Sequence, residues 1–121
     1  MNSAINWFEL PVKDLARAQK FYETMLAIQL RFEVFNGVPT AVFPADSGVG
    51  GALVKDLRRK PTADGAVVYF NAEGKLDACL SRVDAAGGKV LSPKMSIGDP
   101  GHIALVLDTE GNEIGLHTGP S

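Results

Sequence analysis

The second half of this chain repeats the order of secondary-structure elements in its first half, and this repetition limits the possible folds more than any other feature. Hydrophobic periodicity and turn residues predict a strand, a helix and three further strands over residues 4–54, and the same order over residues 66–118. The polar stretch at residues 55–65 is predicted to link them. We therefore interpret residues 1–121 as one domain built from two duplicated modules.

The first module begins with a predicted strand from Ile5 to Leu10, which ends at Pro11 because proline lacks the amide hydrogen that a ladder needs. Asp14 is suited to cap the helix that follows. Apolar residues recur in this helix at intervals of three and four, which predicts one buried face made of Leu15, Ala18, Phe21, Tyr22, Met25 and Leu26.

Three more strands complete the first module. Leu30 to Phe35 alternates apolar and polar residues, and the following Asn36-Gly37 is typical of a type I′ turn, so Val38 to Phe43 should close a hairpin. Gly50 to Val54 is the last strand. The second module should repeat the order strand, helix and three strands, with elements at Ala66–Ala72, Leu76–Ala86, Lys89–Met95, His102–Asp108 and Glu113–Thr118.

One helix covers only one face of a four-stranded sheet, so the other face of each module stays open. We expect an α+β fold in which the two modules place these open faces around a shared cleft. Ligand sites are concave and favour the boundaries between structural units, so this cleft is the predicted binding site.

The composition is that of a globular protein that binds neither nucleic acid nor a membrane. Hydrophobic residues make up 45% and charged residues 21%, which supports a packed core. The formal net charge of -2 is too weak for a phosphate-binding surface, and no apolar run reaches the roughly 18 residues of a membrane span. No export signal is recognisable, so the expected location is cytoplasmic, and the single Cys79 is predicted to lie in the core.

Four segments carry a resemblance to a known family: Phe8-Glu9-Leu10-Pro11-Val12-Lys13-Asp14-Leu15, Phe21-Tyr22, Ala85-Ala86-Gly87-Gly88-Lys89-Val90, and Asp108-Thr109-Glu110-Gly111-Asn112-Glu113-Ile114-Gly115-Leu116. In this order and spacing the chain resembles the vicinal oxygen chelate superfamily of glyoxalase I, bleomycin-resistance proteins and extradiol dioxygenases. The resemblance implies two βαβββ modules in a cupped mixed sheet, a homodimer, and in many members a divalent metal.

The resemblance also assigns metal-binding positions, and this chain offers no ligand at them. Metal-dependent members carry a His on the first strand, a His on the fifth and a Glu on the last, where this chain has Trp7, Val67 and Gly115. The remaining position falls in or near residues 50–53, which hold no carboxylate or imidazole. A catalytic zinc needs three protein ligands, so we expect no metal and no other cofactor.

Strand alternation predicts which side chains face the cleft. If Trp7 faces it, Glu9 does too, whereas Phe8 and Leu10 turn toward the helix. Ile114 and Leu116 should likewise turn toward the helix. On the fifth and last strands the residues that face the cleft should be Val67, Tyr69, Asn71, Glu113, Gly115 and His117.

These residues leave several roles open. Trp7 fits a core position or a stacking wall for a planar ligand, and Glu9 is either paired or a base with a raised pKa. His102 and His117, at one end of a predicted hairpin, fit proton transfer or two surface positions. Together with Glu113 they form an alternative metal set, although a one-residue change of register would separate the two histidines.

The leading hypothesis is therefore a protein that binds a small molecule in the cleft without the usual metal. Its predicted ligand-binding residues are Trp7, Tyr69, Asn71, Glu113 and His102, and the candidate catalytic residues are Glu9 and His117. The alternative is an enzyme that uses a divalent metal, either a lyase or isomerase similar to lactoylglutathione lyase or a dioxygenase. The sequence leaves open whether the chain is an enzyme at all, and whether modules pair within one chain or swap between two.

Overall fold

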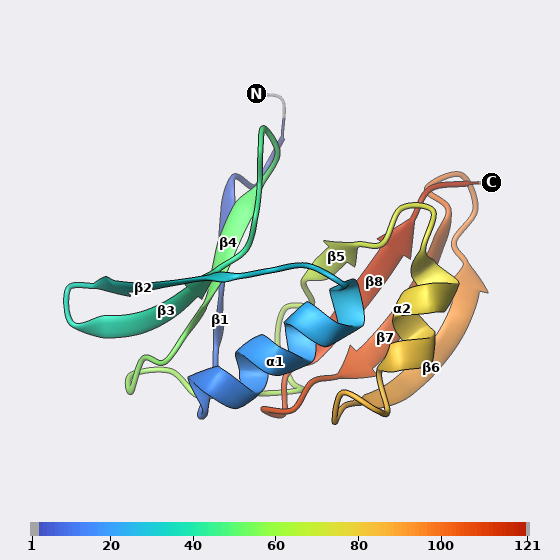
Figure 1. The fold of residues 1–121 in the computed structure, drawn as a ribbon. Coiled ribbons are helices and arrows are strands. Elements are labelled where there is room, and N and C mark those ends of the chain that lie inside the picture. Colours follow the sequence, from blue (N-terminus) through green and yellow to red (C-terminus); the bar gives the residue numbers. More distant parts are fainter. Residues whose placement is uncertain (1–2, 121) are drawn as a thin grey trace.

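The protein, described by a computed structural model over residues 3–120, consists of two four-stranded mixed sheets and two helices (Figure 1). The elements are β1 (Trp7–Pro11), α1 (Leu15–Leu26), β2 (Arg31–Phe35), β3 (Val38–Val42), β4 (Gly50–Val54), β5 (Tyr69–Asn71), α2 (Leu76–Arg82), β6 (Lys89–Ser96), β7 (His102–Leu107) and β8 (Glu113–Thr118). The strand orders are β1-β4-β3-β2 and β5-β8-β7-β6, which confirms the α+β fold with two βαβββ modules. Within residues 3–120, neither helix is long and apolar enough to cross a membrane.

Helix α1 forms where the spacing of its apolar residues predicted it. The Asp14 carboxylate caps its start by accepting a hydrogen bond from the Arg17 amide at 3.0 Å, and Ala27 ends it in the left-handed conformation, with φ 56°. All six residues of the predicted apolar face are buried: Leu15, Ala18, Phe21, Tyr22, Met25 and Leu26.

The predicted hairpin is also confirmed. Asn36 and Gly37 both have positive φ angles, of 51° and 79°, as a type I′ turn requires. Strand β2 pairs antiparallel with β3 across this turn, so that Phe35 lies opposite Val38.

Two elements of the second module are shorter than predicted. Helix α2 ends at Arg82 instead of Ala86, because the chain then closes a turn in which the Gly88 amide donates to the Val83 carbonyl at 3.0 Å. Strand β5 comprises Tyr69–Asn71 instead of Ala66–Ala72. At the start of β8 the Glu113 amide donates to the Thr62 carbonyl of the linker at 3.4 Å, and the Gly115 amide donates to the Val68 carbonyl, just before β5, at 2.9 Å.

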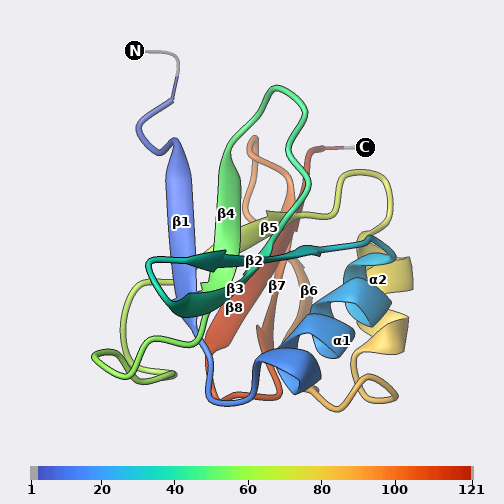
Figure 2. The same cartoon turned by 60° about the vertical axis from the view of Figure 1, so that its left-hand side comes forward.

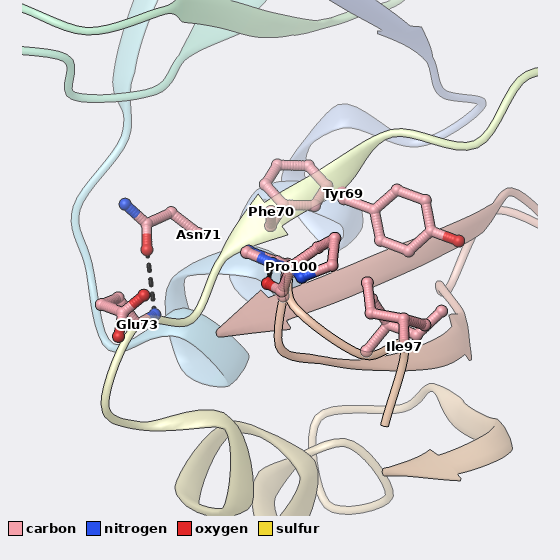
Figure 3. A pocket seen from close by; sticks show the side chains of 8 residues that line it. Tyr69, Phe70, Asn71, Glu73, Ile97 and Pro100 are labelled. Atoms are coloured by element: carbon pink, nitrogen blue, oxygen red, sulfur yellow. Dashed lines mark hydrogen bonds between the residues drawn. The ribbon is translucent and has the colours of Figure 1, made fainter. Parts of the chain in front are cut away.

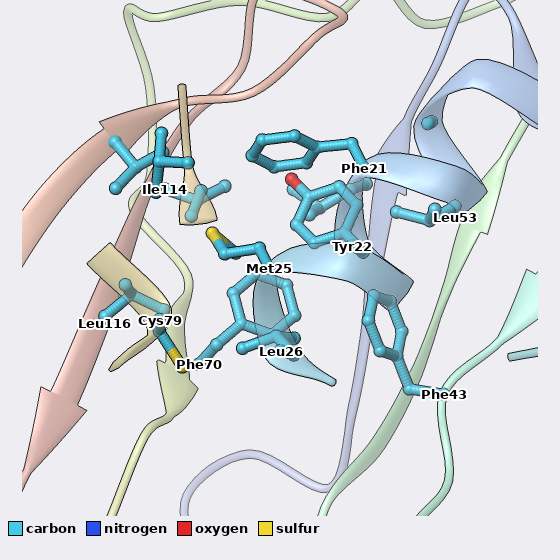
Figure 4. Close-up of a cluster of buried hydrophobic side chains, with 14 of the residues drawn as sticks. Phe21, Tyr22, Met25, Leu26, Phe43, Leu53, Phe70, Cys79, Ile114 and Leu116 are labelled. Atoms are coloured by element: carbon cyan, nitrogen blue, oxygen red, sulfur yellow. The ribbon is translucent and has the colours of Figure 1, made fainter. Parts of the chain in front are cut away.

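Both modules contribute to one hydrophobic core, and α1 contacts α2 within it (Figures 2 and 4). The rings of Phe8 and Phe43 from the first module lie 5.5 and 5.2 Å from the ring of Phe70 in the second. Such tilted and edge-on aromatic pairs add to the stabilisation that burial gives. The helix-facing sides of both sheets are thus joined, and their open faces point away from the common core.

A buried carboxylate fastens the turn between β7 and β8 to the first module. Asp108 Oδ2 accepts a hydrogen bond from the Tyr22 hydroxyl at 2.6 Å, and Asp108 Oδ1 accepts from the amides of Glu110 and Asn112 at 2.8 and 2.9 Å. The Asn112 side-chain amide donates in turn to the Pro11 carbonyl at 2.9 Å. Burial and the neighbouring Asp108 raise the pKa of Tyr22 well above its usual value, so this hydroxyl remains a donor.

The second carboxylate of this turn, Glu110, binds the start of α1. It accepts hydrogen bonds from the amides of Lys13 and Asp14 at 2.9 and 2.8 Å, and from two guanidinium nitrogens of Arg17 at 2.7 and 3.1 Å. Burial would raise the pKa of Glu110, but the hydrogen bonds from Arg17, the Asp14 amide, the Thr109 hydroxyl and the Lys13 amide outweigh burial and lower the pKa to about 2. The folded protein therefore favours the charged form.

Replacing Glu110 with glutamine should destabilise the protein at neutral pH. Because the pKa of Glu110 falls from 4.5 to about 2 on folding, its charge stabilises the native state above pH 4.5, and this contribution is lost as the pH falls toward 2. We expect E110Q to lower the free energy of unfolding by roughly 2 to 3 kcal/mol at pH 7, and the gap from wild type to narrow between pH 4.5 and pH 2. Chemical denaturation across this pH range measures both effects.

The matched control is D77N, which removes an exposed carboxylate that pairs with Lys94 at 3.3 Å. Exposed ion pairs contribute at most about 1 kcal/mol, so D77N should remain close to wild type. Equal stability of E110Q and wild type at pH 7 would contradict the role assigned to Glu110.

Candidate functional site

A pocket with a volume of about 770 Å³ lies on the open face of the second sheet, between β5, β7, β8 and the loop at residues 97–101 (Figure 3). Its walls combine aromatic, aliphatic and a few polar side chains, as ligand pockets do. The lining residues are Tyr69, Phe70, Asn71, Glu73, Ile97, Pro100, Ile103 and His117.

The two sides of this pocket differ in polarity. Figure 3 shows Tyr69 and Ile97 on one side and Asn71 and Glu73 on the other, with Pro100 between them. On the polar side, the Asn71 side-chain oxygen accepts a hydrogen bond from the Glu73 amide at 2.9 Å. The pocket therefore offers one apolar and one hydrogen-bonding surface to a ligand.

His117 joins the pocket wall to the loop above it. Its Nε2 lies 2.6 Å from the Pro100 carbonyl oxygen. A carbonyl only accepts, so Nε2 carries the proton, and Nδ1 is the free acceptor of a neutral ring. The backbone thereby selects one tautomer of His117 and holds its orientation.

The structure does not bring His102 and His117 together. His102 lies opposite Thr118 in the β7–β8 pair, whereas His117 lies opposite Ile103, so the two imidazoles project from opposite faces of the sheet. Glu113 shares the face of His117 but starts β8, at the far end of the strand from it. Among residues 3–120, no three His, Cys, Asp or Glu side chains are grouped as a metal site, so the alternative metal set is not assembled.

The predicted alternation of β1 is confirmed, but its polar side chains do not line the pocket. Leu10 is buried and Phe8 packs against the core, whereas Trp7 and Glu9 lie on the open face of the first sheet. The Trp7 side chain is 47% exposed, and its indole nitrogen donates to Glu9 Oε2 at 3.2 Å. Trp7 is therefore not a core residue, and Glu9 has a neutral partner.

The expected cleft between the open faces of both modules does not form within one chain. Every residue that lines the pocket belongs to the second module. The physical reason is that α1 and α2 pack against each other, so the modules meet through their helix-facing sides. Trp7 and Glu9 are consequently absent from the lining of this pocket. His102, on the other face of the second sheet, and Glu113, at its far end, are absent too, whereas Tyr69, Asn71 and His117 belong to it.

Each module places an aromatic ring over a glycine of its parallel neighbour strand. Trp7 lies opposite Gly50, and Tyr69 lies opposite Gly115. This register makes Tyr69, two residues after Val67, the counterpart of Trp7. A Cβ added at Gly115 would overlap the Tyr69 ring, and one added at Gly50 would lie 3.1 Å from the Trp7 ring.

These aromatic rings occupy the positions at which ligand side chains of a metal would be sought. An indole, an alkyl group and two glycines donate no electron pair to a cation, and the Tyr69 phenol alone falls short of three protein ligands. The residues present do not fit a divalent metal at this place.

Sequence reasoning missed five residues of the pocket: Phe70, which alternation along β5 turns away from the cleft, and four residues outside β5 and β8, namely Glu73, Ile97, Pro100 and Ile103. Ile103 could have been found by extending strand alternation to β7, where it lies opposite His117. Glu73, Ile97 and Pro100 lie at or beyond strand ends, and no periodicity gives the direction of a loop side chain. Glycine and proline at residues 98–101 predict a loop there, but not which of its side chains face the pocket.

Comparison with known proteins agrees with the fold. Residues 4–116 match the family model described as the Glyoxalase/Bleomycin resistance protein/Dioxygenase superfamily. A glyoxylase-like domain-containing protein of Didymella fabae is 29% identical over 128 residues, which cover 99% of this chain and 97% of that protein. The putative glyoxylase CFP32 of Mycobacterium tuberculosis is 28% identical over 122 residues, which cover 92% of this chain but 44% of that protein, so the chain spans less than half of this relative.

A crystal structure shares the fold over 98% of this chain. The glyoxalase/bleomycin resistance protein of Albidiferax ferrireducens superposes with a TM-score of 0.75 at 19% identity, covering 98% of this chain and 100% of that one. At this identity the similarity concerns the fold. The family match over residues 4–116 and the two βαβββ modules together show that the chain belongs to the Glyoxalase/Bleomycin resistance protein/Dioxygenase superfamily.

Proposed function

We propose that this chain binds a small organic molecule in the pocket of its second module, without the divalent metal that many members of its superfamily use. The observation that carries the proposal is the pocket itself, a concave site of about 770 Å³ with apolar walls and a few convergent polar groups. Tyr69 would provide an aromatic surface for the ligand. Asn71, Glu73 and His117 would provide its hydrogen-bonding partners.

The metal-free part of the proposal rests on side-chain chemistry. Trp7 covers Gly50 in the first module, and Tyr69 covers Gly115 in the second. This arrangement supports apolar contact with a ligand at these four residues instead of metal coordination. A carboxylate at residue 115 would require the Tyr69 ring to move.

A lyase or isomerase remains the second candidate, and His117 is the residue that favours it. Its Nε2 is engaged with the Pro100 carbonyl, which leaves Nδ1 as the atom that would take a proton from a bound substrate. Glu9 is a weaker candidate for the base, because it lies outside the pocket lining and accepts a hydrogen bond from Trp7.

A homodimer and a cytoplasmic location complete the proposal. Large apolar side chains remain exposed on the open faces, among them Trp7 at 47%, Tyr69 at 46% and Met95 at 42%. Exposed apolar surface of this kind is typical of interaction sites, and a second copy would cover it.

The metal-free proposal predicts that the purified protein holds well below one metal ion per chain. Elemental analysis before and after treatment with a chelator provides the measurement. Adding zinc, manganese or nickel should leave the melting temperature unchanged, because only a ligand of the native state raises it. A stoichiometric metal that the chelator removes together with stability would overturn this part of the proposal.

The pocket proposal predicts that ligands found in a thermal-shift screen of aromatic, thiol and hydroxy-acid compounds depend on Tyr69. Tyr69→Ala should weaken binding by about 0.5 to 1.5 kcal/mol beyond the lost contact area, which appears as a smaller shift of the melting temperature. The control is Phe35→Ala, since Phe35 has a similar exposure of 52% and lies outside the pocket lining. Equal melting-temperature shifts in Tyr69→Ala and Phe35→Ala would show that the ligand binds outside this pocket.

The dimer proposal predicts a sedimentation-equilibrium mass twice the chain mass of 12.8 kDa. Trp7→Asp should shift the equilibrium toward the monomer, because it places a charge in an apolar contact. Leu57→Asp is the matched control, since Leu57 is 93% exposed in the linker. A wild-type protein that sediments only as a monomer would contradict the proposal.

A further inference from the structure

We infer that the pocket selects planar aromatic molecules that carry a positive charge, and that it discriminates against anions. This inference rests on the proposed function and adds to it the charge class of the ligand. Among the eight residues that line the pocket, Glu73 is the only acid, and none is a lysine or arginine. The side-chain charge of the pocket is therefore negative when His117 is neutral.

The Glu73 carboxylate has no cationic partner in the part of the chain that the structure describes. It accepts hydrogen bonds from the Gly119 amide at 2.8 Å and from the Thr118 hydroxyl at 3.4 Å, both of them neutral donors. A carboxylate has about four acceptor sites, so further donors have room. Glu73 thus presents an uncompensated charge that a ligand cation can pair with.

The remaining charges of the second sheet do not neutralise Glu73. Lys94 pairs with Asp77 of α2 at 3.3 Å. Lys89 aligns with Leu107 and Glu113, at the opposite end of the sheet from His117. Neither lysine lines the pocket.

A second copy that covered the pocket with its first sheet would not bring a free cation either. The open face of that sheet carries Glu9, Arg31 and Glu33. Arg31 already pairs with Glu33 at 2.5 Å, and Glu9 accepts from the Trp7 indole. The charge preference is therefore the same for the single chain and for a dimer with this arrangement.

The two-sided pocket also gives the shape of the ligand. A flat ring would lie against Tyr69 and Ile97, and a cationic group on it would reach toward Asn71 and Glu73 on the opposite side (Figure 3). An anion at the same place would leave water without finding a counter-charge and would lie near a carboxylate. The attraction of a cation to Glu73 and the repulsion of an anion by it therefore both favour cationic ligands.

Three molecules with one ring system test this inference: 9-aminoacridine, acridine and acridine-9-carboxylate, which are cationic, neutral and anionic near pH 7.5. Titration followed by calorimetry should give the tightest binding for the amine, about three- to ten-fold tighter than acridine, and the weakest for the carboxylate. The advantage of the amine should shrink as salt is raised, because salt screens a partly exposed charge pair.

Glu73→Gln tests which residue causes the preference. Glutamine keeps an oxygen that can accept from the Gly119 amide, so the native state should be retained, and an unchanged melting temperature checks this. In this variant the ratio of the amine affinity to the acridine affinity should fall to about one, whatever the affinity for acridine itself. Asp77→Asn, which removes a carboxylate from α2 outside the pocket lining, should bind all three molecules like wild type.

The outcomes separate this inference from the proposed function. If Tyr69→Ala weakens the binding of acridine, but acridine-9-carboxylate binds as tightly as 9-aminoacridine, the inferred preference for cations is wrong and the pocket proposal is retained. An amine preference that persists in Glu73→Gln overturns the role of Glu73. If none of the three molecules binds at millimolar concentration, the inference fails, and the thermal-shift screen with Tyr69→Ala decides the pocket proposal separately.

Discussion

The relative placement of the two modules depends on two carboxylates that the turn between β7 and β8 buries against the first module. Asp108 and Glu110 are 4% and 5% exposed, and each accepts several hydrogen bonds, from Tyr22 in one case and from the start of α1 in the other. Burying such groups without partners would cost several kcal/mol, so the native state requires these contacts to form together. A module that rotated away would break the hydrogen bonds of these carboxylates to Tyr22 and to the start of α1. The contacts thereby bring the helix-facing sides of both sheets into one core and leave the open faces outside it.

This placement explains why the pocket belongs to one module. Once α1 and α2 pack together, the space between the sheets is filled by Phe8, Phe43, Phe70 and Tyr22. The pocket lined by Tyr69, Asn71 and His117 therefore lies on the outer, open side of the second sheet. On the second sheet the loop at residues 97–101 folds over that side and is held there by His117, so the pocket depends on a loop contact as much as on the sheet.

The fold could be predicted from the sequence wherever local patterns decide the structure. The apolar face of α1, the Asn36-Gly37 turn and the inward direction of Ile114 and Leu116 all follow from periodicity or turn chemistry, and the structure confirms them. The side on which the modules meet could not be predicted, because both faces of each sheet carry large apolar residues. The contact of α1 with α2 decides it, and this contact joins helices that lie far apart in the sequence.

The site was less predictable than the fold, since it depends on register and on loops. A one-residue difference in the β7–β8 pairing decides whether His102 shares a face with His117. This pairing is determined by long-range packing, because Ala104 and Leu116 lie opposite each other and are both buried in the core. Glu73 and Pro100 reach the pocket from loops, whose side-chain directions are set by contacts with Gly119 and His117 that lie 46 and 17 residues away. Patterns within one strand carry no information about such contacts.

The open faces tie ligand binding to assembly in the proposed homodimer. Tyr69 is both part of the pocket wall and one of the large apolar side chains left 46% exposed, so a ligand and a second copy would use the same surface. If the second copy closes the pocket above the ligand, ligand binding and dimerisation should strengthen each other. If the ligand and the second copy need the same contacts with Tyr69, ligand binding and dimerisation should weaken each other. Linkage requires the effect to be equal in both directions, because one coupling free energy describes it. The physical basis of this coupling is Tyr69, which a ligand and a second copy would both contact.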